Sequence, residues 1–347
     1  MAKSLNSVIG LDVGRFALKS VLLQRRGPGK IAVTHYASRE LGQPVETADQ
    51  LSKELKALLK DMGGSSKNCA VAVSSADSIL RIIEQPETPT RLLREALRLN
   101  GMTLLNQDCR DFIIDCDQIS GPGDAAGTAP VPNGTPRKYL VGGLRREQVA
   151  HLQNAVEGAS ANVGTLQLAP VCVFNAFEFA HPDIFNEQAF FLVDIGHTSS
   201  TMIIGVKREL VLVRSIDFGG KALLEALTAL SGEERSSVLM ALDQDDELMV
   251  ENTRLALMVL CREVGSSIGF FEGRREETIG RVFVSGGPAK SGTILQVMSE
   301  EIHMPCEAWN PLETCEMSVP AAQRERSAVD ELDLHVACGA AAELLNA

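Results

Sequence analysis

The sequence predicts a two-lobed α/β fold in which both lobes are built on the same β-β-β-α unit. One apolar strand ends at Asp12-Val13-Gly14 and another at Asp194-Ile195-Gly196, and each turn leads into an apolar return strand. The two turns lie about half of the 347-residue chain apart, as a duplicated unit requires. The composition agrees, because 347 residues with 45% apolar content are enough for two hydrophobic cores.

The first lobe begins with β-rich runs on either side of the first turn. After them, Thr47 and Gln50 form a capping box that predicts a helix over residues 48–62, and Gly63-Gly64 ends it. We expect the strands of this lobe at residues 7–24 (two runs), 31–36, 69–74 and 79–83.

A change of composition at Pro86 predicts a subdomain inserted into the first lobe. A helix begins at Thr90, with leucines at helical spacing. Residues 120–136 contain four glycines and four prolines, which predicts a surface loop whose order the sequence leaves open. Strands are expected on both sides of this loop, at 112–116 and 139–144, and a helix follows at 146–159.

The second lobe repeats the strand order of the first and adds helices. Strands are expected at 189–193, 200–206, 210–216 and 281–285, and helices at 220–230, from Ser231, at 247–272, 290–303 and 334–345. We therefore divide the chain into a first lobe (1–85, 145–188 and 334–347), the inserted subdomain (86–144), a second lobe (189–230 and 275–333) and a helical subdomain (231–274). Trp309 is expected at a lobe surface.

Charge and cysteine usage narrow the function. The net charge is −12, which repels phosphate backbones and anionic lipids, so we expect no nucleic-acid binding. No apolar stretch approaches the roughly 20 residues of a membrane span, and the N-terminus has no signal-peptide pattern. The eight cysteines form no C-x-x-C pair, which is typical of reduced core thiols. These features indicate a cytoplasmic protein with no direct membrane insertion.

The two Asp-x-Gly turns suggest a site for phosphate and magnesium. Glycine after a strand-end aspartate allows a sharp turn with exposed amides, and such amides form concave anion sites. The carboxylates of Asp12 and Asp194 suit Mg²⁺ that is bound through water. One such turn is most often an ordinary hairpin, but a pair at half-chain offset is far more specific. A third element, the strand that closes on Gly286-Gly287 before Pro288, permits close approach of a flat ligand.

The three elements together resemble the actin-like ATPase superfamily, a ribonuclease H-like fold with two phosphate loops and an adenosine loop in this order. Within it the chain resembles the PilM family of type IV pilus assembly proteins. The segments IGLDVGRFALKSVLL and FFLVDIGHTSSTMIIGVKRELVLVRSIDFGGKALLEAL look like the two phosphate loops of that family. VFVSGGPAKSGTILQVMSEEIHMPCEAWNPLE looks like its adenosine segment. The resemblance covers nearly the whole chain.

The resemblance implies ATP bound with Mg²⁺ between the lobes, with Asp12 and Asp194 on the metal. It also implies that the cytoplasmic N-terminal tail of a bitopic, PilN-like membrane protein docks in a groove by the inserted subdomain. That partner would hold the protein at the inner membrane, and self-association is left open. The expected cofactor-binding residues are Asp12, Gly14, Arg15, Lys19, Asp194, Gly196, His197, Thr198, Ser199, Gly219, Gly220, Gly286 and Gly287.

The first phosphate loop and the adenosine loop depart from the family pattern. Arg15, Phe16 and Ala17 stand where the family has small hydroxyl residues, and Pro288 stands where another glycine is common. We therefore expect ATP binding with weak or absent hydrolysis, and no residue is nominated as catalytic. These departures favour one alternative, a nucleotide-free scaffold of the same fold. A small-molecule phosphotransferase is a second alternative, but the first lobe offers no recognisable acid or base for it.

Overall fold

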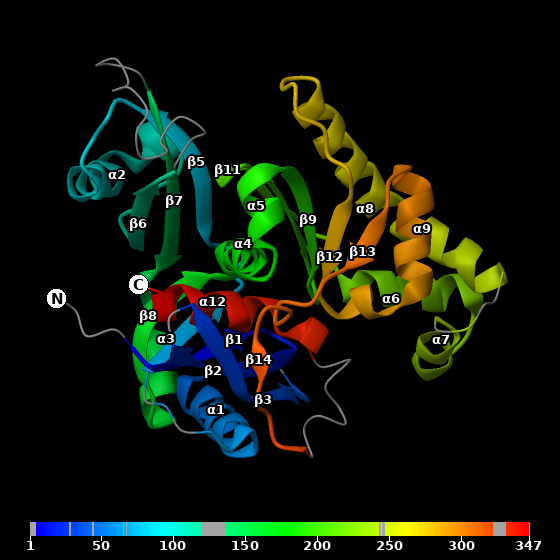
Figure 1. The fold of residues 1–347 in the computed structure, drawn as a ribbon, viewed down its shortest axis with the longest axis horizontal. Helices are drawn as coiled ribbons and strands as arrows, with labels where there is room; N and C mark the ends of the chain where they lie inside the picture. Colours follow the sequence, from blue (N-terminus) through cyan, green and yellow to red (C-terminus); the bar gives the residue numbers. More distant parts are fainter. Residues whose placement is uncertain are drawn as a thin grey trace.

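The computed structural model describes residues 5–27, 29–43, 45–64, 66, 68–119, 136–242, 244, 247–321 and 331–346. The loop predicted at 120–136 lies outside them, apart from Pro136. Two mixed sheets lie on either side of a central pair of helices, α4 (Ala169–Ala180) and α12 (His335–Asn346) (Figure 1). The largest hydrophobic core lies around this pair, because it joins side chains of both sheets to α4 and α12.

The first sheet runs in the order β14-β3-β2-β1-β4-β8. Within it β1 pairs antiparallel with β2 and parallel with β4, and β2 pairs antiparallel with β3. Its outer face packs against α1 and α3. The capping box at Thr47 is present, and Gly63 ends α1 in the left-handed conformation. The elements are β1 (Ser7–Val13), β2 (Ala17–Gly27), β3 (Lys30–Glu40), α1 (Ala48–Met62), β4 (Asn68–Val73), α3 (Arg146–Gly158), β8 (Asn162–Leu168) and β14 (Glu316–Met317).

The second sheet repeats this topology in the order β11-β10-β9-β12-β13. β9 pairs antiparallel with β10 and parallel with β12, as β1 does with β2 and β4. The predicted duplication is thereby confirmed. Helices α6, α8 and α9 cover the outer face. The elements are α5 (Pro182–Glu187), β9 (Ala189–Ile195), β10 (Ser200–Val206), β11 (Glu209–Ile216), α6 (Gly220–Ser231), α7 (Arg235–Ala241), α8 (Glu247–Glu272), β12 (Val282–Ser285), η1 (Gly287–Lys290), α9 (Gly292–Ile302), β13 (Cys306–Ala308) and η2 (Glu331–Asp333).

A third, small sheet stands apart from the other two and runs in the order β5-β7-β6. Its core is formed with α2, which packs on it (Figure 1). β5 pairs along its full length with β7, although it lies before residue 86, where we placed the start of the inserted subdomain. The division into subdomains stays a prediction. The elements are β5 (Ile79–Gln85), α2 (Thr90–Leu105), β6 (Phe112–Gln118) and β7 (Arg137–Arg145).

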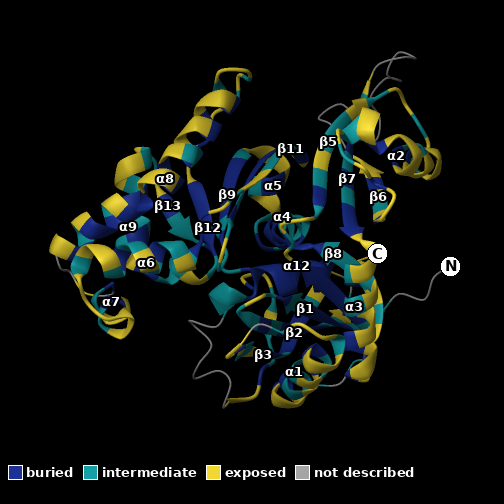
Figure 2. Ribbon diagram, turned by 180° about the vertical axis from the view of Figure 1, so that it is seen from behind, coloured by how far each residue is buried: buried dark blue, intermediate teal, exposed yellow. Residues whose placement is uncertain are grey.

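Glycine lets the central helix α12 approach its neighbours closely. A Cβ on Gly339 would lie 1.7 Å from Cys172 O on α4, and a Cβ on Gly10 of β1 would lie 1.9 Å from Ala337 O. No side chain fits at either place, so these glycines set the depth of α12 between the sheets. Figure 2 shows α12 as a buried element at the centre of the molecule. All eight cysteines are free, and all except Cys315 are buried.

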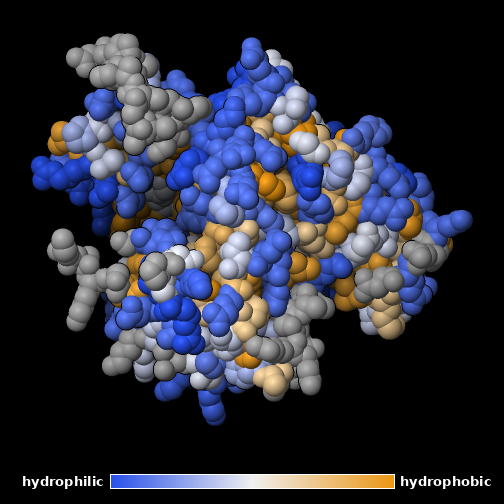
Figure 3. All heavy atoms as spheres, viewed as in Figure 1, coloured by the Kyte–Doolittle hydropathy of each residue, from blue (hydrophilic) through white to orange (hydrophobic). Residues whose placement is uncertain are grey.

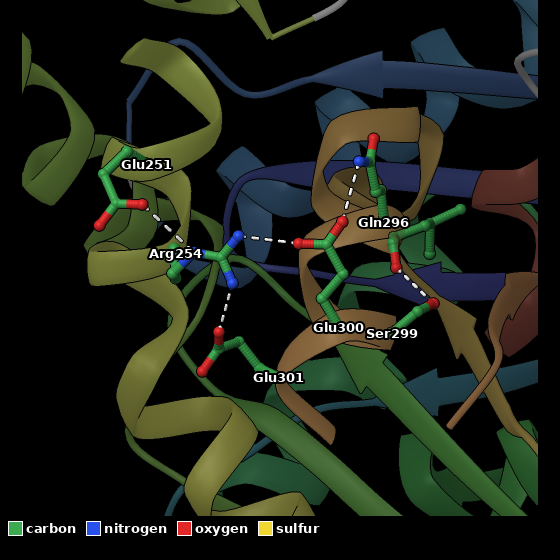
Figure 4. A network of polar contacts seen from close by, with 7 residues as sticks. Glu251, Arg254, Gln296, Ser299, Glu300 and Glu301 are labelled. Carbon is green, nitrogen blue, oxygen red and sulfur yellow. Dashed lines mark hydrogen bonds and ion pairs between the residues drawn. The ribbon is translucent and has the colours of Figure 1, made fainter. Parts of the chain in front are cut away.

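One arginine fixes α8 against α9 on the surface of the second lobe. Arg254 of α8 donates to Glu301 Oε1 at 2.5 Å and to Glu300 Oε2 at 2.8 Å, both on α9 (Figure 4). Glu251, one turn earlier on α8, is a third partner at 3.3 Å. Within the part of the chain that the structure describes, no helix has both the length and the apolar character needed to cross a membrane.

Candidate functional site

The two predicted turns open into one cavity. Gly14 follows β1, Gly196 follows β9, and both line a cavity of about 910 Å³ to which both lobes contribute. A Cβ on Gly14 would lie 2.6 Å from Ala17 O, and a Cβ on Gly196 would lie 2.9 Å from Ser199 O. Turns this tight therefore need glycine, as the sequence pattern indicated.

The two strand-end carboxylates occupy equivalent positions at this cavity. Asp12 lies opposite Lys19 on β2, and Asp194 lies beside Ser285 on β12, whose hydroxyl donates to Asp194 Oδ1 at 2.8 Å. Burial raises the pKa of Asp12 to about 6; Lys19 lowers it, while Asp194 and Asp333 raise it. Burial also raises the pKa of Asp194, against the hydrogen bond from Ser285. Both carboxylates thus lie where a bound cation would stabilise their charged form.

A third carboxylate joins two lysines in the cavity. Asp333 of η2 contacts Lys19 of β2, with Nζ 3.7 Å from Oδ1, and it also accepts a hydrogen bond from Lys290 of η1. The three residues come from the two lobes and from the segment before α12. Their ion pairs therefore connect the two lobes at the cavity. Asp333 was not predicted from the sequence, because the residues around it form no motif.

The start of α6 supports the second turn from behind. The amides of Gly220 and Lys221 donate to Gly196 O and His197 O, each at 2.8 Å. A Cβ on Gly219 would lie 2.7 Å from both carbonyl oxygens. The first amides of α6 therefore hold the turn in place, and Gly219 is small because the turn lies directly against it.

One part of the cavity lining is apolar. Gly286 has φ 91°, and a Cβ there would lie 2.1 Å from Ile195 O, so β12 and β9 approach each other closely at this point. Ser291 caps α9 and donates to Leu242 O at 3.0 Å, which joins η1 to the end of α7. The apolar wall that results suits a flat ring system. Its residues are Leu223, Leu224, Leu227, Leu239, Leu242 and Ile294.

An aromatic contact crosses the cavity between the two turns. The ring of Phe16 stacks on the ring of His197, with centroids 4.6 Å apart and planes inclined by 11°. Burial lowers the pKa of His197, and the charges of Lys221 and Arg235 lower it further. The imidazole is therefore neutral at neutral pH, and the contact joins two uncharged rings.

Comparison with known proteins gives the family. A family model described as type IV pilus assembly protein PilM matches residues 10–344. The chain belongs to this family. Among curated protein sequences, no significant match to the chain was found.

Solved structures agree on the fold of this PilM-family chain. A chain in a structure of the PilM–PilN type IV pilus biogenesis complex matches with a TM-score of 0.81 and 22% identity over 99% of both chains. The ethanolamine utilization protein EutJ from Carboxydothermus hydrogenoformans matches at 0.52 and 15% identity, over 98% of this chain and 91% of that one. A diol dehydratase-reactivating factor in nucleotide-free form matches at 0.57 and 8% identity, over 99% and 100%. The predicted actin-like fold is confirmed.

The cavity brings together most of the residues expected from the PilM-family pattern. Gly219 is the exception, since it lies behind the second turn. Arg15 and Thr198 are exposed. The predicted residues that line the cavity are Asp12, Gly14, Arg15, Lys19, Asp194, Gly196, His197, Thr198, Ser199, Gly220, Gly286 and Gly287. Ser285 was not predicted, although it is the last strand residue before the glycine pair.

The donor set fits magnesium held together with a phosphate ligand. Among the residues described, no group of three or more His, Cys, Asp or Glu side chains is placed to hold a metal ion. Asp12 and Asp194 alone therefore offer too few ligands for a bare cation site. Mg²⁺ commonly keeps several waters and binds through one or two carboxylates plus phosphate oxygens, which is compatible with these two residues.

Proposed function

We propose that this chain binds ATP with Mg²⁺ in the cavity between its lobes and acts as an assembly protein of a type IV pilus machine. The observation that supports nucleotide binding is that Gly14 and Gly196 line one cavity. A strand-end carboxylate, Asp12 or Asp194, lies beside each of them. Exposed amides of the two turns would contact phosphate oxygens, and the apolar wall near Gly286 would hold the base.

Each carboxylate has a separate role in this proposal. Asp12 and Asp194 would hold Mg²⁺ through water, and the hydrogen bond from Ser285 keeps Asp194 oriented toward the cavity. Magnesium would neutralise phosphate charge between the lobes. Hydrolysis is expected to be weak or absent, because Phe16 offers no hydrogen-bond donor and no described residue is identified as a base for water.

Calorimetry tests nucleotide binding. Mg-ATP is titrated into the parent chain, into Asp194→Ala and into Asp183→Ala, a matched control at an exposed position on α5. We expect binding by the parent and the control, and a loss of at least about tenfold in affinity for Asp194→Ala. Absence of heat with the parent would refute the binding of ATP.

A second candidate function, a nucleotide-free scaffold, is favoured by Asp333. Its carboxylate already forms ion pairs with Lys19 and Lys290, two lysines that line the cavity. A phosphate chain would have to compete with that carboxylate for them. The same calorimetric titration, made with Mg-ATP and with Mg-ADP, separates the two functions, because a scaffold gives no heat with either nucleotide.

Recruitment to the inner membrane is proposed to depend on the cytoplasmic N-terminal tail of a PilN-like membrane protein. Two features support a docking place by the small sheet. β6 is an edge strand, which an extended peptide can join by backbone hydrogen bonds. On the face shown in Figure 3, hydrophobic side chains gather in the notch between this small sheet and the first lobe.

Peptide binding tests recruitment. A labelled synthetic tail of a PilN-like protein is titrated into the parent chain, with a scrambled peptide as reference. Ile113→Asp places a charge on the exposed side of β6, and Met240→Asp is its control on α7. We expect weaker binding only for Ile113→Asp. No binding of the tail to the parent would refute recruitment and would favour the phosphotransferase alternative.

A further inference from the structure

The backbone on each side of the contact between Phe16 and His197 is held by a hydrogen bond. The backbone of Phe16 is fixed by Leu41, whose amide donates to Phe16 O at 2.7 Å, and the backbone of His197 is fixed by the amide of Lys221 at 2.8 Å. The two rings are half-buried and nearly parallel. The two backbone positions that carry the rings are therefore anchored, one in each turn.

This ring pair joins the first lobe to the second. The apolar wall, η1 and the start of α6 belong to the second lobe and its helical subdomain, and the turn at Gly196 lies directly against Gly219 and the start of α6. The Gly196 turn and His197 belong to the second lobe, whereas the Gly14 turn and Phe16 belong to the first. A phosphate group that contacts both turns at the place where Phe16 touches His197 must therefore separate the two rings.

The same place is unfavourable for a phosphate group. Ring centroids 4.6 Å apart are in van der Waals contact, so no tetrahedral group fits between them. Phe16 has no hydrogen-bond donor, and the imidazole is neutral because burial and the nearby cations lower its pKa. A short phosphate chain can be held by the second lobe alone, whereas a longer one must separate the rings.

We propose that the Phe16–His197 pair selects the ligand by phosphate-chain length, so that the cavity binds nucleoside diphosphates in preference to triphosphates. The inference rests on the proposed nucleotide site and specifies its ligand. A stacked aromatic pair is a weak contact, so its loss is expected to raise triphosphate affinity about two- to tenfold.

Calorimetry with a matched pair of variants tests the selection. Mg-ATP and Mg-ADP are each titrated into the full chain, into Phe16→Ser and into Phe270→Ser, where the same change is made at an exposed ring on α8. We expect the parent and Phe270→Ser to bind ADP more tightly than ATP. In Phe16→Ser, ATP affinity should rise about two- to tenfold while ADP affinity changes by less than about twofold.

NMR of the parent chain gives a second readout that needs no variant at position 16. The ring protons of His197, assigned with His197→Gln, are shielded by the stacked ring of Phe16. We expect Mg-ATP to shift them downfield as the rings separate, and Mg-ADP to leave them nearly unchanged. Equal shifts with both nucleotides would overturn the inference.

The outcomes separate the inference from the proposed function. If the parent binds nucleotide but Phe16→Ser leaves the ratio of ATP to ADP affinity unchanged, the selection is wrong and the nucleotide site stands. If no protein binds either nucleotide, both are wrong. If the parent binds ADP and only Phe16→Ser binds ATP, the ring pair excludes the triphosphate completely, and ADP replaces ATP as the ligand of the proposed site.

Discussion

Arg275, just after α8, binds Glu209 of β11 through two hydrogen bonds of 3.2 Å each. Lys138 of β7 donates to the same carboxylate at 2.6 Å, so the small sheet and the second lobe meet at one buried charge. Burial alone would raise the pKa of Glu209, but the hydrogen bonds and charges of Arg275 and Lys138 outweigh it and hold the pKa below its usual value.

Glu209→Gln is therefore expected to destabilise the chain by about 1–3 kcal/mol at pH 7. A carboxylate whose pKa is depressed by folding stabilises the protein above its unfolded pKa of about 4.3, and this contribution is lost as the pH falls through the folded value. Urea unfolding at pH 7 and near pH 3 measures it. The difference in free energy of unfolding between the parent and Glu209→Gln should be smaller near pH 3 than at pH 7.

The control for this prediction is Glu307→Gln. Glu307 accepts from Arg281 at 2.9 Å on the surface, where an ion pair contributes less than about 1 kcal/mol. If both variants lose the same free energy of unfolding, the contacts of Arg275 and Lys138 with Glu209 stabilise the fold no more than a surface ion pair does.

Asp333→Asn is expected to strengthen nucleotide binding. The change removes the carboxylate that Lys19 and Lys290 share, so both ammonium groups become available to phosphate. We expect ATP affinity to rise roughly threefold to thirtyfold, since charge-assisted hydrogen bonds are strong in partly buried sites. Calorimetry measures the affinity, with Asp183→Asn as the control.

The pKa of Asp12 should fall in Asp333→Asn, because the charge of Asp333 raises it in the parent. Unchanged affinity would mean that neither lysine contacts the ligand.

Gly219→Ala is expected to displace the second turn. Its backbone is extended, with φ −148°, so alanine fits the conformation, but its Cβ would lie 2.7 Å from Gly196 O and His197 O. We expect a loss of about 1–3 kcal/mol in stability and weaker nucleotide binding. Gly265→Ala on α8 is the matched control, because nothing lies within 4 Å of its Cβ. It should gain about 0.5–1 kcal/mol from helix propensity. Thermal or urea unfolding of both variants decides whether crowding at the turn is the cause.

The sequence predicts the duplicated strands and the two turns because those features are local. An apolar strand that ends in Asp-x-Gly specifies its own turn, and the capping box at Thr47 specifies the start of α1. Elements that depend on distant partners were missed. β14 has only two residues, and it becomes a strand by pairing with Ala32 and Val33 of β3, which no local pattern reveals.

The prediction for Trp309 is wrong for the same reason. We expected it at a lobe surface, but it is 3% exposed and packs edge-on against His335 with ring centroids 4.3 Å apart. Its burial follows from the position of α12 between the sheets. The contact of Phe16 with His197 was likewise hidden, because it joins two turns that are close only after both lobes have folded.

The raised pKa of Asp12 makes stability depend on pH in a defined window. The folded value is about 6, above an unfolded value of about 3.9, so between these limits the folded state binds more protons than the unfolded state. Stability therefore falls as the pH rises from about 4 to about 6. Asp12→Asn removes this group and should become more stable than the parent by roughly 1–3 kcal/mol at pH 7, with little difference near pH 4. Urea unfolding of both proteins across this range measures the difference, and Asp183→Asn should show no such window.

Mg-ATP should reverse the order of stability of the parent and Asp12→Asn at pH 7, because only the parent gains stability from a cation at Asp12. If Asp12→Asn is less stable than the parent at every pH without nucleotide, burial of the charged Asp12 carboxylate does not destabilise the folded state.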